Sequence, residues 1–420
     1  MTDELAVYLH NTHIATVTRS SGRPRSVVEF LWDTDGDLGD TRLTECFALL
    51  PGLSPDRRRA SRFLGGYLPE GNQRQALAAK RKIAKDDLFG FLREYGGSIA
   101  GALSFRTAAD NASYEVMTPA MLRRAFTEAL DGHNLGARDD SRSMLQGFQP
   151  KVLVAKFDDD GWYQPHGSAH STHILKPPRG GAKSRLYDEF YGHELARAVG
   201  LASFHSAMMK SGTTPYLAIE RYDREVSDGI VRVIHQEDAA QAMALDWTTD
   251  GAKFQDRIRP HDRDNASAYS VAELLAGLDD NPVETWLEQL VFRTLVGDND
   301  GHAKNVSIVH VPGRDRVADL YDAVPNLFQE GRIDWTMALA VDGVFDHRNI
   351  SVDHLAREAR SWGTGLRRST IEATIQGTLS RFADALNSVP VPRNGSPGMV
   401  AAIEWNLERL SAGKEIGVRR

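Results

Sequence analysis

Residues 296–305 read Val296-Gly297-Asp298-Asn299-Asp300-Gly301-His302-Ala303-Lys304-Asn305, a stretch with two acids, two amides, a histidine and a lysine. Apolar residues recur at helical spacing from Val283 to Leu295, directly before it. The run Val306-Ser307-Ile308-Val309-His310, directly after it, is typical of a strand. We therefore expect a polar loop supported by a helix and a strand, an arrangement in which catalytic groups are commonly found.

The spacing of the polar residues resembles that of a kinase catalytic loop. Asp300 and Asn305 are separated as in the protein-kinase pattern Asp-x-x-x-x-Asn. The segment Pro312-Gly313-Arg314-Asp315 predicts a turn, and the strand after it ends at Leu320-Tyr321-Asp322. Asp322 thus follows a hairpin, as the metal-binding Asp of kinases does. The order of these residues favours phosphoryl transfer.

The chemistry of phosphoryl transfer accounts for these residue types. One carboxylate must orient the attacking hydroxyl and accept its proton, and we predict that Asp300 does so. Mg²⁺ is bound by a few carboxylate or amide oxygens together with the nucleotide phosphates, and Asn305 and Asp322 offer such oxygens. Lys304 is the second predicted catalytic residue, because its charge can offset that of the transferred phosphoryl group.

Each of these residues also has a simpler explanation. Asp300-Gly301 is an ordinary turn pair, and an Asp at a strand end, such as Asp322, can be a cap. A calcium loop could start at Asp298, but the later Gly and the terminal Glu of that pattern are absent. For His302, a structural hydrogen bond within the loop is favoured over metal binding. Only the ordered set, between a helix and a hairpin, favours the kinase interpretation.

Upstream residues supply other parts of a kinase. Lys176 ends an apolar strand, as a phosphate-binding Lys does, and Glu189 on the following predicted helix could hold it in place. The segment 220–224 follows a buried-looking strand, where a hinge could offer backbone groups to adenine. The alternative for Lys176 and Glu189 is that both are solvated surface residues. The alternative for residues 220–224 is a charged surface segment. No Walker A or Gly-x-Gly-x-x-Gly pattern occurs, which argues against P-loop and Rossmann enzymes.

Composition narrows the class of protein without selecting one. The chain has 420 residues, 41% of them hydrophobic, and a formal net charge of −7. Such a chain is typical of soluble globular proteins of two or three domains, and the acidic balance argues against a dedicated nucleic-acid binder. Cys46 is the one cysteine, which excludes an internal disulfide framework. We see no secretory signal and no transmembrane run, so we expect a cytoplasmic protein.

The periodicity along the chain predicts an α+β protein. The predicted strands span residues 5–9, 13–17, 26–32, 98–105, 152–157, 172–176, 216–222 and 306–310. The predicted helices span residues 73–83, 87–95 (with Asp86 as N-cap), 119–130, 184–199, 283–295, 353–362, 369–385 and 399–410. Residues 110–114 are polar and predict a linker, and residues 143–151 predict an irregular loop.

Several stretches, taken in order, resemble the HipA family, the toxin kinases of bacterial type II toxin–antitoxin modules. They are Gly66-Tyr67-Leu68-Pro69-Glu70-Gly71, the block from Asp87-Leu88-Phe89 to Ser98-Ile99-Ala100-Gly101-Ala102-Leu103, Gln146-Gly147-Phe148-Gln149-Pro150-Lys151, Thr172-His173-Ile174-Leu175-Lys176-Pro177, Glu220-Arg221-Tyr222-Asp223-Arg224, His235-Gln236-Glu237-Asp238 and Asp300-Gly301-His302-Ala303-Lys304-Asn305. The similarity runs from the first predicted strand to beyond Asp322.

The resemblance implies a two-lobed fold, distantly similar to protein and phosphoinositide kinases, with a small N-terminal α/β subdomain and a helical C-terminal lobe. The boundaries implied are 1–107 for the subdomain, 108–142 for a helix and linker, 143–235 for the N-lobe and 236–420 for the C-lobe. It implies transfer of phosphate from ATP, with Mg²⁺, to a serine or threonine of a protein. The expected target is an aminoacyl-tRNA synthetase, with the glutamyl enzyme first, and the expected result is growth arrest or persistence.

The resemblance also assigns roles to residues. Asp300 becomes the catalytic base, and Asn305 and Asp322 become magnesium ligands. The residues implied at the nucleotide are Lys176, Glu189, Glu220, Tyr222, His302, Gln146 and Gly147. The expected partner is a HipB-like helix-turn-helix antitoxin, through which the chain reaches operator DNA. The alternatives are a kinase of this fold with another target, or a catalytically silent co-repressor that binds the antitoxin.

One departure from the family concerns autophosphorylation. Family members commonly carry the modified Ser three residues before the loop glycine, and counted from Gly147 that position is Met144. Ser143 and Ser141 lie nearby. We favour Ser143 as the phosphorylated residue, which requires a one-residue shift relative to the family pattern. The alternative is that regulation by autophosphorylation of this loop is altered or absent.

Overall fold

A computed structural model describes residues 4–19, 24–33, 38, 40–48, 54–107, 111–131, 141–147, 149–157, 161–180, 182–259, 264–279, 282–329 and 334–419. The chain forms two compact units. Unit 1 comprises Met1–Arg179, Met209–Thr248 and Val309–Asp315, and unit 2 comprises Gly180–Met208, Thr249–Ile308 and Arg316–Arg420. The four segments implied by the family resemblance remain a prediction.

Unit 1 begins with an antiparallel sheet of order β3-β2-β1-β4. Its strands are β1 (Glu4–Leu9), β2 (Thr12–Arg19), β3 (Val28–Trp32) and β4 (Leu103–Arg106). Every second residue of β1 is buried, as expected for a sheet with one face on a core. His10 and Asn11 both adopt positive φ, which allows the tight turn between β1 and β2.

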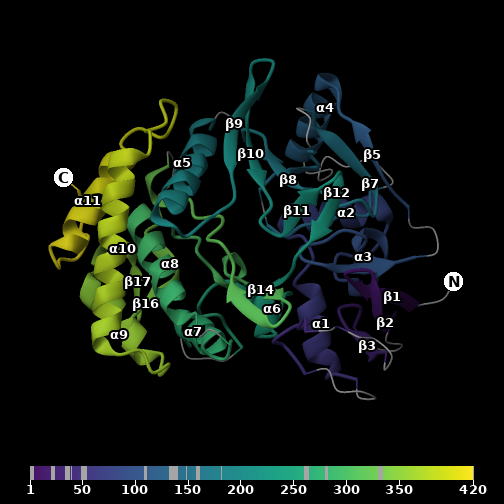
Figure 1. Cartoon of the computed structure of the whole chain (residues 1–420), viewed down its shortest axis with the longest axis horizontal. Coiled ribbons are helices and arrows are strands. Elements are labelled where there is room, and N and C mark those ends of the chain that lie inside the picture. The colour runs from purple at the N-terminus through teal and green to yellow at the C-terminus, as the bar shows by residue number, and fades with distance from the viewer. Residues whose placement is uncertain are drawn as a thin grey trace. The chain divides into compact units, whose positions relative to one another are not determined.

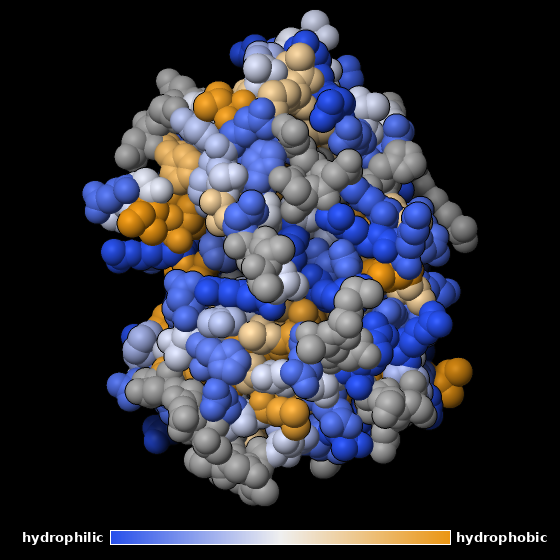
Figure 2. Space-filling view, turned by 90° about the vertical axis from the view of Figure 1, so that its right-hand side faces the viewer, coloured by the Kyte–Doolittle hydropathy of each residue, from blue (hydrophilic) through white to orange (hydrophobic). Residues whose placement is uncertain are grey.

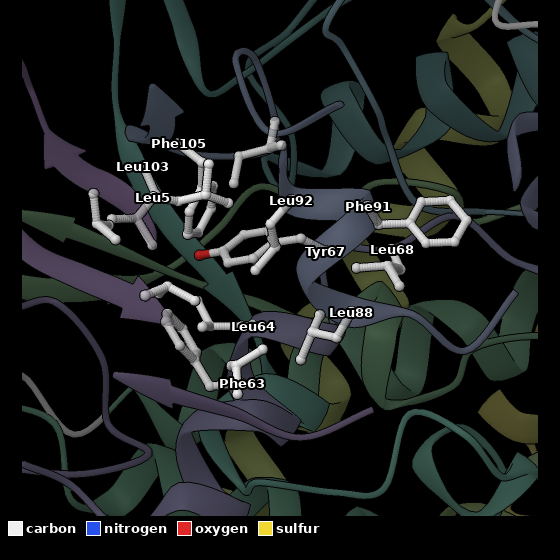
Figure 3. Close-up of a cluster of buried hydrophobic side chains, with 14 of the residues drawn as sticks. Leu5, Phe63, Leu64, Tyr67, Leu68, Leu88, Phe91, Leu92, Leu103 and Phe105 are labelled. Carbon is white, nitrogen blue, oxygen red and sulfur yellow. The ribbon is translucent and has the colours of Figure 1, made fainter. Parts of the chain in front are cut away.

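Three helices supply the other side of this core. They are α1 (Arg57–Gly65), α2 (Gly71–Arg81) and α3 (Leu88–Tyr95). Figure 3 shows Phe63, Tyr67 and Leu92 from the helical segment together with Leu103 and Phe105 from β4 in one buried cluster. Burial of these side chains stabilises the unit by about 1.5–3 kcal/mol for each large apolar residue.

A second part of unit 1 carries the strand that ends at Lys176. Strands β6 (Val152–Val154), β8 (His173–Lys176) and β10 (Thr214–Glu220) pair antiparallel in that order. Helix α4 (Pro119–Leu130), capped by Thr118, contributes to the apolar cluster on this sheet. The remaining elements here are β5 (Ala112–Val116), β7 (Tyr163–Gly167), β9 (Ser206–Ser211), β11 (Arg224–Ser227), β12 (Ile230–Val233), β13 (His235–Asp238) and α6 (Ala239–Ala242).

Unit 2 is mainly helical, with α10 against α5, α8, α9 and α11 (Figure 1). The helices are α5 (Ser184–Val199), α7 (Ala268–Ala276), α8 (Val283–Val296), α9 (Val352–Ser361), α10 (Arg368–Ser388) and α11 (Met399–Ser411). The hairpin β14 (Ser307–Val311) and β15 (Arg314–Val317) follows α8, and its residues Val309–Asp315 belong to unit 1. Within unit 2, β16 (Thr336–Val341) pairs with β17 (Val344–Asp346). Short 3₁₀ turns lie at η1 (Asp250–Ala252), η2 (Ala303–Asn305), η3 (Asn326–Phe328) and η4 (His347–Asn349).

Several sequence-based predictions were wrong in detail. The predicted strand over 98–105 begins only at Leu103, and the predicted linker at 110–114 contributes to β5, which pairs with β7. Asp87, not Asp86, caps α3, because its carboxylate accepts from the Gly90 amide at 3.0 Å. The strand after the turn at 312–315 was predicted to end at Leu320-Tyr321-Asp322, but β15 ends at Val317. Helix α1, the β11–β12 hairpin and the β16–β17 pair were not predicted.

Within the described residues, no helix combines the length and the apolar character that crossing a bilayer requires. The face in Figure 2 is mostly hydrophilic, with hydrophobic residues in separate patches.

Candidate active site

The predicted catalytic loop starts where α8 ends, at Gly297. This glycine has φ +70°, the left-handed conformation that commonly ends helices. A Cβ atom here would lie 2.6 Å from the Phe328 ring, so the close approach also requires glycine. The backbone of Leu327 donates to the Gly297 carbonyl at 3.1 Å, which holds the start of the loop against η3.

A buried ion pair organises the loop. Arg293 of α8 donates to the Asp298 carboxylate, and both side chains are buried. The same guanidinium donates to the backbone carbonyls of Asn305 at 2.8 Å and Tyr321 at 3.3 Å. Arg293 therefore ties together both ends of the loop and the residue before Asp322. Sequence analysis missed this role, although an Arg inside an apolar helical run was a signal for it.

Asp298 has an unusual electrostatic environment. Burial and, to a smaller extent, the charge of Asp322 raise its pKa to about 6, against the opposing effect of Arg293. Its other oxygen accepts from the Asp300 amide at 3.1 Å and from Asn326 Nδ2 at 3.3 Å. Asp298 is thus a structural acceptor inside the loop, and the influence of Asp322 shows that two carboxylates lie near one another here.

Asp300 and Asn305 are brought together as the spacing predicts. The Asp300 side chain is 57% exposed, whereas Asn305 is buried. Asn305 Nδ2 donates to the Asp300 carbonyl at 3.0 Å, which fixes the amide and leaves its oxygen as the atom available to a ligand. His302 Nε2 lies 3.9 Å from an Asp300 carboxylate oxygen, so His302 borders the same group.

The other loop residues are held by Tyr321. Its hydroxyl donates to the Lys304 carbonyl at 2.8 Å and hydrogen-bonds to Ser307 Oγ at 2.7 Å. Lys304 is buried on η2. Asp322 follows with φ +53°, a conformation uncommon outside glycine and enriched at functional sites.

A pocket of about 400 Å³ lies beside Asp300, within unit 2. Its lining residues are Phe254, Gln255, Arg257, Asn299, Asp300, Asn326, Asp334, Thr336, Met337, Ala338 and Phe345. Most of them come from segments that sequence analysis did not connect with the loop, because no motif marks residues 254–257 or the β16–β17 pair.

The upstream candidates lie on β8, on β10, in the turn after β10 and on α5. Lys176 is buried at the end of β8, opposite Leu217 of β10. Glu220 ends β10, and the Tyr222 hydroxyl donates to Gln236 Oε1 at 3.0 Å. Lys176 belongs to unit 1, whereas Glu189 is buried on α5 in unit 2. Their predicted pairing remains a prediction.

Comparison with known proteins identifies the family. The HipA-like C-terminal domain model matches residues 143–386, and the HipA N-terminal domain model matches residues 5–106. The chain belongs to the HipA family. It is 30% identical over 320 residues to Putative kinase Y4mE of Sinorhizobium fredii, which covers 71% of this chain and 74% of that protein.

Two further comparisons concern Shewanella oneidensis. Its Serine/threonine-protein kinase toxin HipA is 24% identical over 369 residues, covering 82% of this chain and 81% of that protein. The structure of HipA from its complex with HipB and operator DNA covers 96% of this chain and 95% of that one, with a TM-score of 0.79 and 20% identity. These matches confirm the predicted α+β, kinase-like fold, and the chain is a HipA-family serine/threonine protein kinase.

The loop from Gln146 to Lys151, which the HipA family implies at the nucleotide phosphates, forms hydrogen bonds within unit 1. Gln146 Nε2 donates to the Gly66 carbonyl, and Lys151 Nζ donates to the Gln146 carbonyl. Gly147 has φ +103°, and a Cβ there would lie 2.6 Å from Lys151 Nζ. Phe148 lies outside the described residues.

Both candidate autophosphorylation residues are buried. Ser141 is 4% exposed and Ser143 is 5% exposed. Ser143 forms a β-bridge with Ser98, and its hydroxyl has no hydrogen-bond partner among the described residues. Met144, at the position of the usual family serine, is fully buried. Modification of Ser143 therefore requires this segment to leave its present place.

Unit 1 also holds a buried charge network around His310. Its Nδ1 lies 2.7 Å from Asp315, and its Nε2 lies 3.0 Å from Glu237. Because both ring nitrogens donate to carboxylates, the imidazole is held in its charged form, and its pKa rises to about 9. Ligand atoms of Glu45, His310 and Asp315 lie within 4.8 Å of one another, near enough for a metal ion. Arg42 pairs with Glu45 and Asp315, so the arrangement is that of an ion-pair network.

Proposed function

We propose that this HipA-family kinase transfers the γ-phosphate of ATP, with Mg²⁺, to a serine or threonine of a protein of translation. The first expected target is an aminoacyl-tRNA synthetase, and within that class the glutamyl enzyme. The observation that supports the proposal best is the exposed Asp300 carboxylate beside the fixed amide of Asn305. An acceptor protein must reach the base from outside, and this exposure allows it.

The donor atoms near the loop suit Mg²⁺. Asn305 presents an oriented amide oxygen, and Asp322 presents a carboxylate near the buried Asp298. Mg²⁺ prefers such oxygen ligands and is commonly bound by few protein groups plus substrate phosphates. When bound, the ion would neutralise charge that develops on the phosphates. We assign Asn305 and Asp322 as its ligands.

Asp300 is assigned as the catalytic base. The acceptor hydroxyl donates its hydrogen bond to the carboxylate, which aligns the oxygen for attack on the phosphorus. As the new P–O bond forms and the bond to the leaving ADP oxygen breaks, the hydroxyl proton passes to Asp300. Lys304 is assigned to stabilise the charge on the transferred group.

The nucleotide is assigned to the residues that the HipA family implies, which are Lys176, Glu189, Glu220, Tyr222, His302, Gln146 and Gly147. Lys176 is buried at a strand end, which is consistent with the position of a phosphate-binding lysine. The positive φ of Gly147 allows a backbone approach that a side chain would block.

The partners follow by analogy with the complex from Shewanella oneidensis. We propose a HipB-like helix-turn-helix antitoxin as partner, with operator DNA reached mainly through it. The net charge of −7 is consistent with little direct affinity for DNA. The free, buried thiol of Cys46 is consistent with a reducing cytoplasm. A silent co-repressor is the alternative, and the intact set Asp300, Asn305 and Asp322 argues against it.

Substitution of Asp300 tests the proposal. We expect Asp300→Asn to lower phosphate transfer by about 10²–10⁴-fold and to abolish growth inhibition, since a general base contributes this much. Asp384→Asn, the same change at an exposed site on α10, is the matched control. The target is then identified by comparing the phosphoproteomes of cells that express the wild type and cells that express Asp322→Ala. Undiminished toxicity of Asp300→Asn would contradict the enzymatic proposal.

A further inference from the structure

The pocket beside Asp300 has an apolar part that phosphoryl transfer itself does not require. Phe254 comes from the segment after η1, Met337 and Ala338 from β16, and Phe345 from β17. Phe254 remains 40% exposed, although a large apolar side chain is normally buried. An apolar wall next to a catalytic carboxylate indicates a place where something other than the reacting atoms binds.

We propose that this pocket binds a large apolar side chain of the acceptor protein, adjacent in sequence to the serine or threonine that is phosphorylated. The inference rests on the proposed function, since it takes Asp300 as the base that meets the hydroxyl. It adds a determinant of acceptor choice, formed by Phe254, Met337 and Phe345.

The pocket is connected to the catalytic loop by hydrogen bonds that fix its position. The Ala338 amide donates to the Asn299 carbonyl at 3.0 Å, and Asn299 Nδ2 donates to the Asp334 carbonyl at 2.7 Å. Asn299 directly precedes Asp300. An acceptor side chain that binds against β16 therefore holds the adjacent serine or threonine at a defined distance from Asp300. Such positioning of the reacting groups accelerates the reaction.

The segment of Phe254 and Gln255, which also lines the pocket, is held in the same way. The Gln255 amide donates to the Ala338 carbonyl at 3.0 Å, and Gln255 Oε1 accepts from the Ala340 amide at 2.8 Å. These bonds join the segment of Phe254 to β16. The Phe254 ring also meets the His302 ring edge-on, with centroids 5.7 Å apart. The apolar wall is thus preformed.

Charge at the pocket disfavours an anionic occupant. Asp300 and Asp334 both line it, so a phosphate or carboxylate would meet two acids. Among the described residues that line the pocket, Arg257 is the one cation, and its guanidinium lies over the Phe345 ring, 5.6 Å from the centroid. At about 400 Å³, the pocket has room for a leucine, methionine or phenylalanine side chain with part of its backbone.

The test begins with the acceptor sites of the wild-type enzyme. Cell lysate treated with phosphatase is incubated with the full chain, ATP and Mg²⁺, and the new phosphosites are mapped. We expect a large apolar residue directly before or after the phosphorylated residue in most of them. Sites without such enrichment would overturn the inference while leaving the kinase function intact, whereas no transfer at all would refute the proposed function and the inference with it.

Pocket variants then separate acceptor binding from nucleotide binding. We expect Phe345→Ala to raise KM for the mapped acceptor protein at least tenfold, with KM for ATP unchanged, because the lost contacts lie on the acceptor side. Phe254→Ala changes an exposed residue, so it serves as a second variant whose folding is less at risk. Ile258→Ala, at a side chain 91% exposed and outside the lining, is the control. A rise in KM for ATP alone would assign the pocket to the nucleotide.

A double-mutant cycle decides whether the two side chains meet. The mapped acceptor is made with its adjacent apolar residue changed to Asn. We expect this change to reduce kcat/KM at least tenfold with the wild-type enzyme and less than threefold with Phe345→Ala, since the contact is already absent there. Equal, additive losses in both enzymes would overturn the inference.

Discussion

Arg293 donates a hydrogen bond to the carboxylate of Asp298, and both partners of this ion pair are almost fully removed from solvent. The pair lies at the start of the proposed catalytic loop, and Arg293 also donates to the carbonyls of Asn305 and Tyr321. A charged residue buried in this way is compensated only while its partners remain. The arrangement therefore makes the loop's geometry depend on one side chain of α8.

Arg293→Met removes that side chain while keeping most of its volume. We expect a loss of about 3–5 kcal/mol in the free energy of unfolding, because Asp298 is left as a buried, unpaired acid. Urea unfolding followed by circular dichroism measures it. Arg368→Met breaks the exposed pair with Glu372 and should change stability by less than about 1 kcal/mol. Equal effects of the two substitutions would contradict the structural role of Arg293.

The local part of the site was predictable from sequence. Helix α8, the loop, and the closeness of Asp300 and Asn305 depend on spacings of a few residues, which periodicity and turn chemistry determine. Where two acids are adjacent, the sequence pattern does not determine which of them caps a helix. Asp86 and Asp87 are equivalent by pattern, and the second caps α3, where it also pairs with Arg19 from β2.

The long-range part of the site was not predictable in this way. The pocket at Asp300 depends on Gln255 and Ala338, which are joined by a backbone hydrogen bond across many residues of chain. Residues 110–114 were polar enough to predict a linker, but the strand β5 forms because β7 offers it a pairing edge. Propensity is a weak guide where tertiary pairing decides the structure.

His310 predicts a pH dependence of stability. Asp315 and Glu237 raise its folded pKa to about 9, above the ordinary value of 6.5. The imidazolium therefore contributes stability that is fully present below pH 6.5 and is lost as the pH rises through about 9, on the order of 3 kcal/mol in total. Urea unfolding between pH 6 and 9.5 should show this decline. In His310→Gln the curve should be flatter over that range, and the exposed His205→Gln should retain the wild-type slope.

Burial of Ser143 predicts slow modification of the folded chain. Its hydroxyl is enclosed, and the neighbouring Met144 amide donates to the Ser98 carbonyl at 3.1 Å. A phosphate has no place in this packing, so modification should accompany loss of that hydrogen bond. We expect Ser143→Glu to remove hydrogen-exchange protection at Met144 while the Phe91 amide in α3 stays protected. Retained protection at Met144 would show that the segment accommodates the charge without moving.

Substitution of Gly301 tests the packing of the loop without changing any of the proposed catalytic side chains. A Cβ here would lie 2.6 Å from Arg293 Cδ and 3.2 Å from Asp298 Oδ2, so Gly301→Ala must displace the buried pair or the loop. We expect a loss of stability of about 1–3 kcal/mol, as for other overpacked sites, together with a large fall in kcat. Gly377→Ala provides the contrast, because it lies inside α10, where the nearest atom is a flexible Arg381 nitrogen at 3.7 Å. That substitution should stabilise the chain by about 0.5–1 kcal/mol through helix propensity and leave kcat unchanged. A Gly301→Ala enzyme with wild-type kcat would mean that the Arg293–Asp298 pair can move without disturbing Asp300.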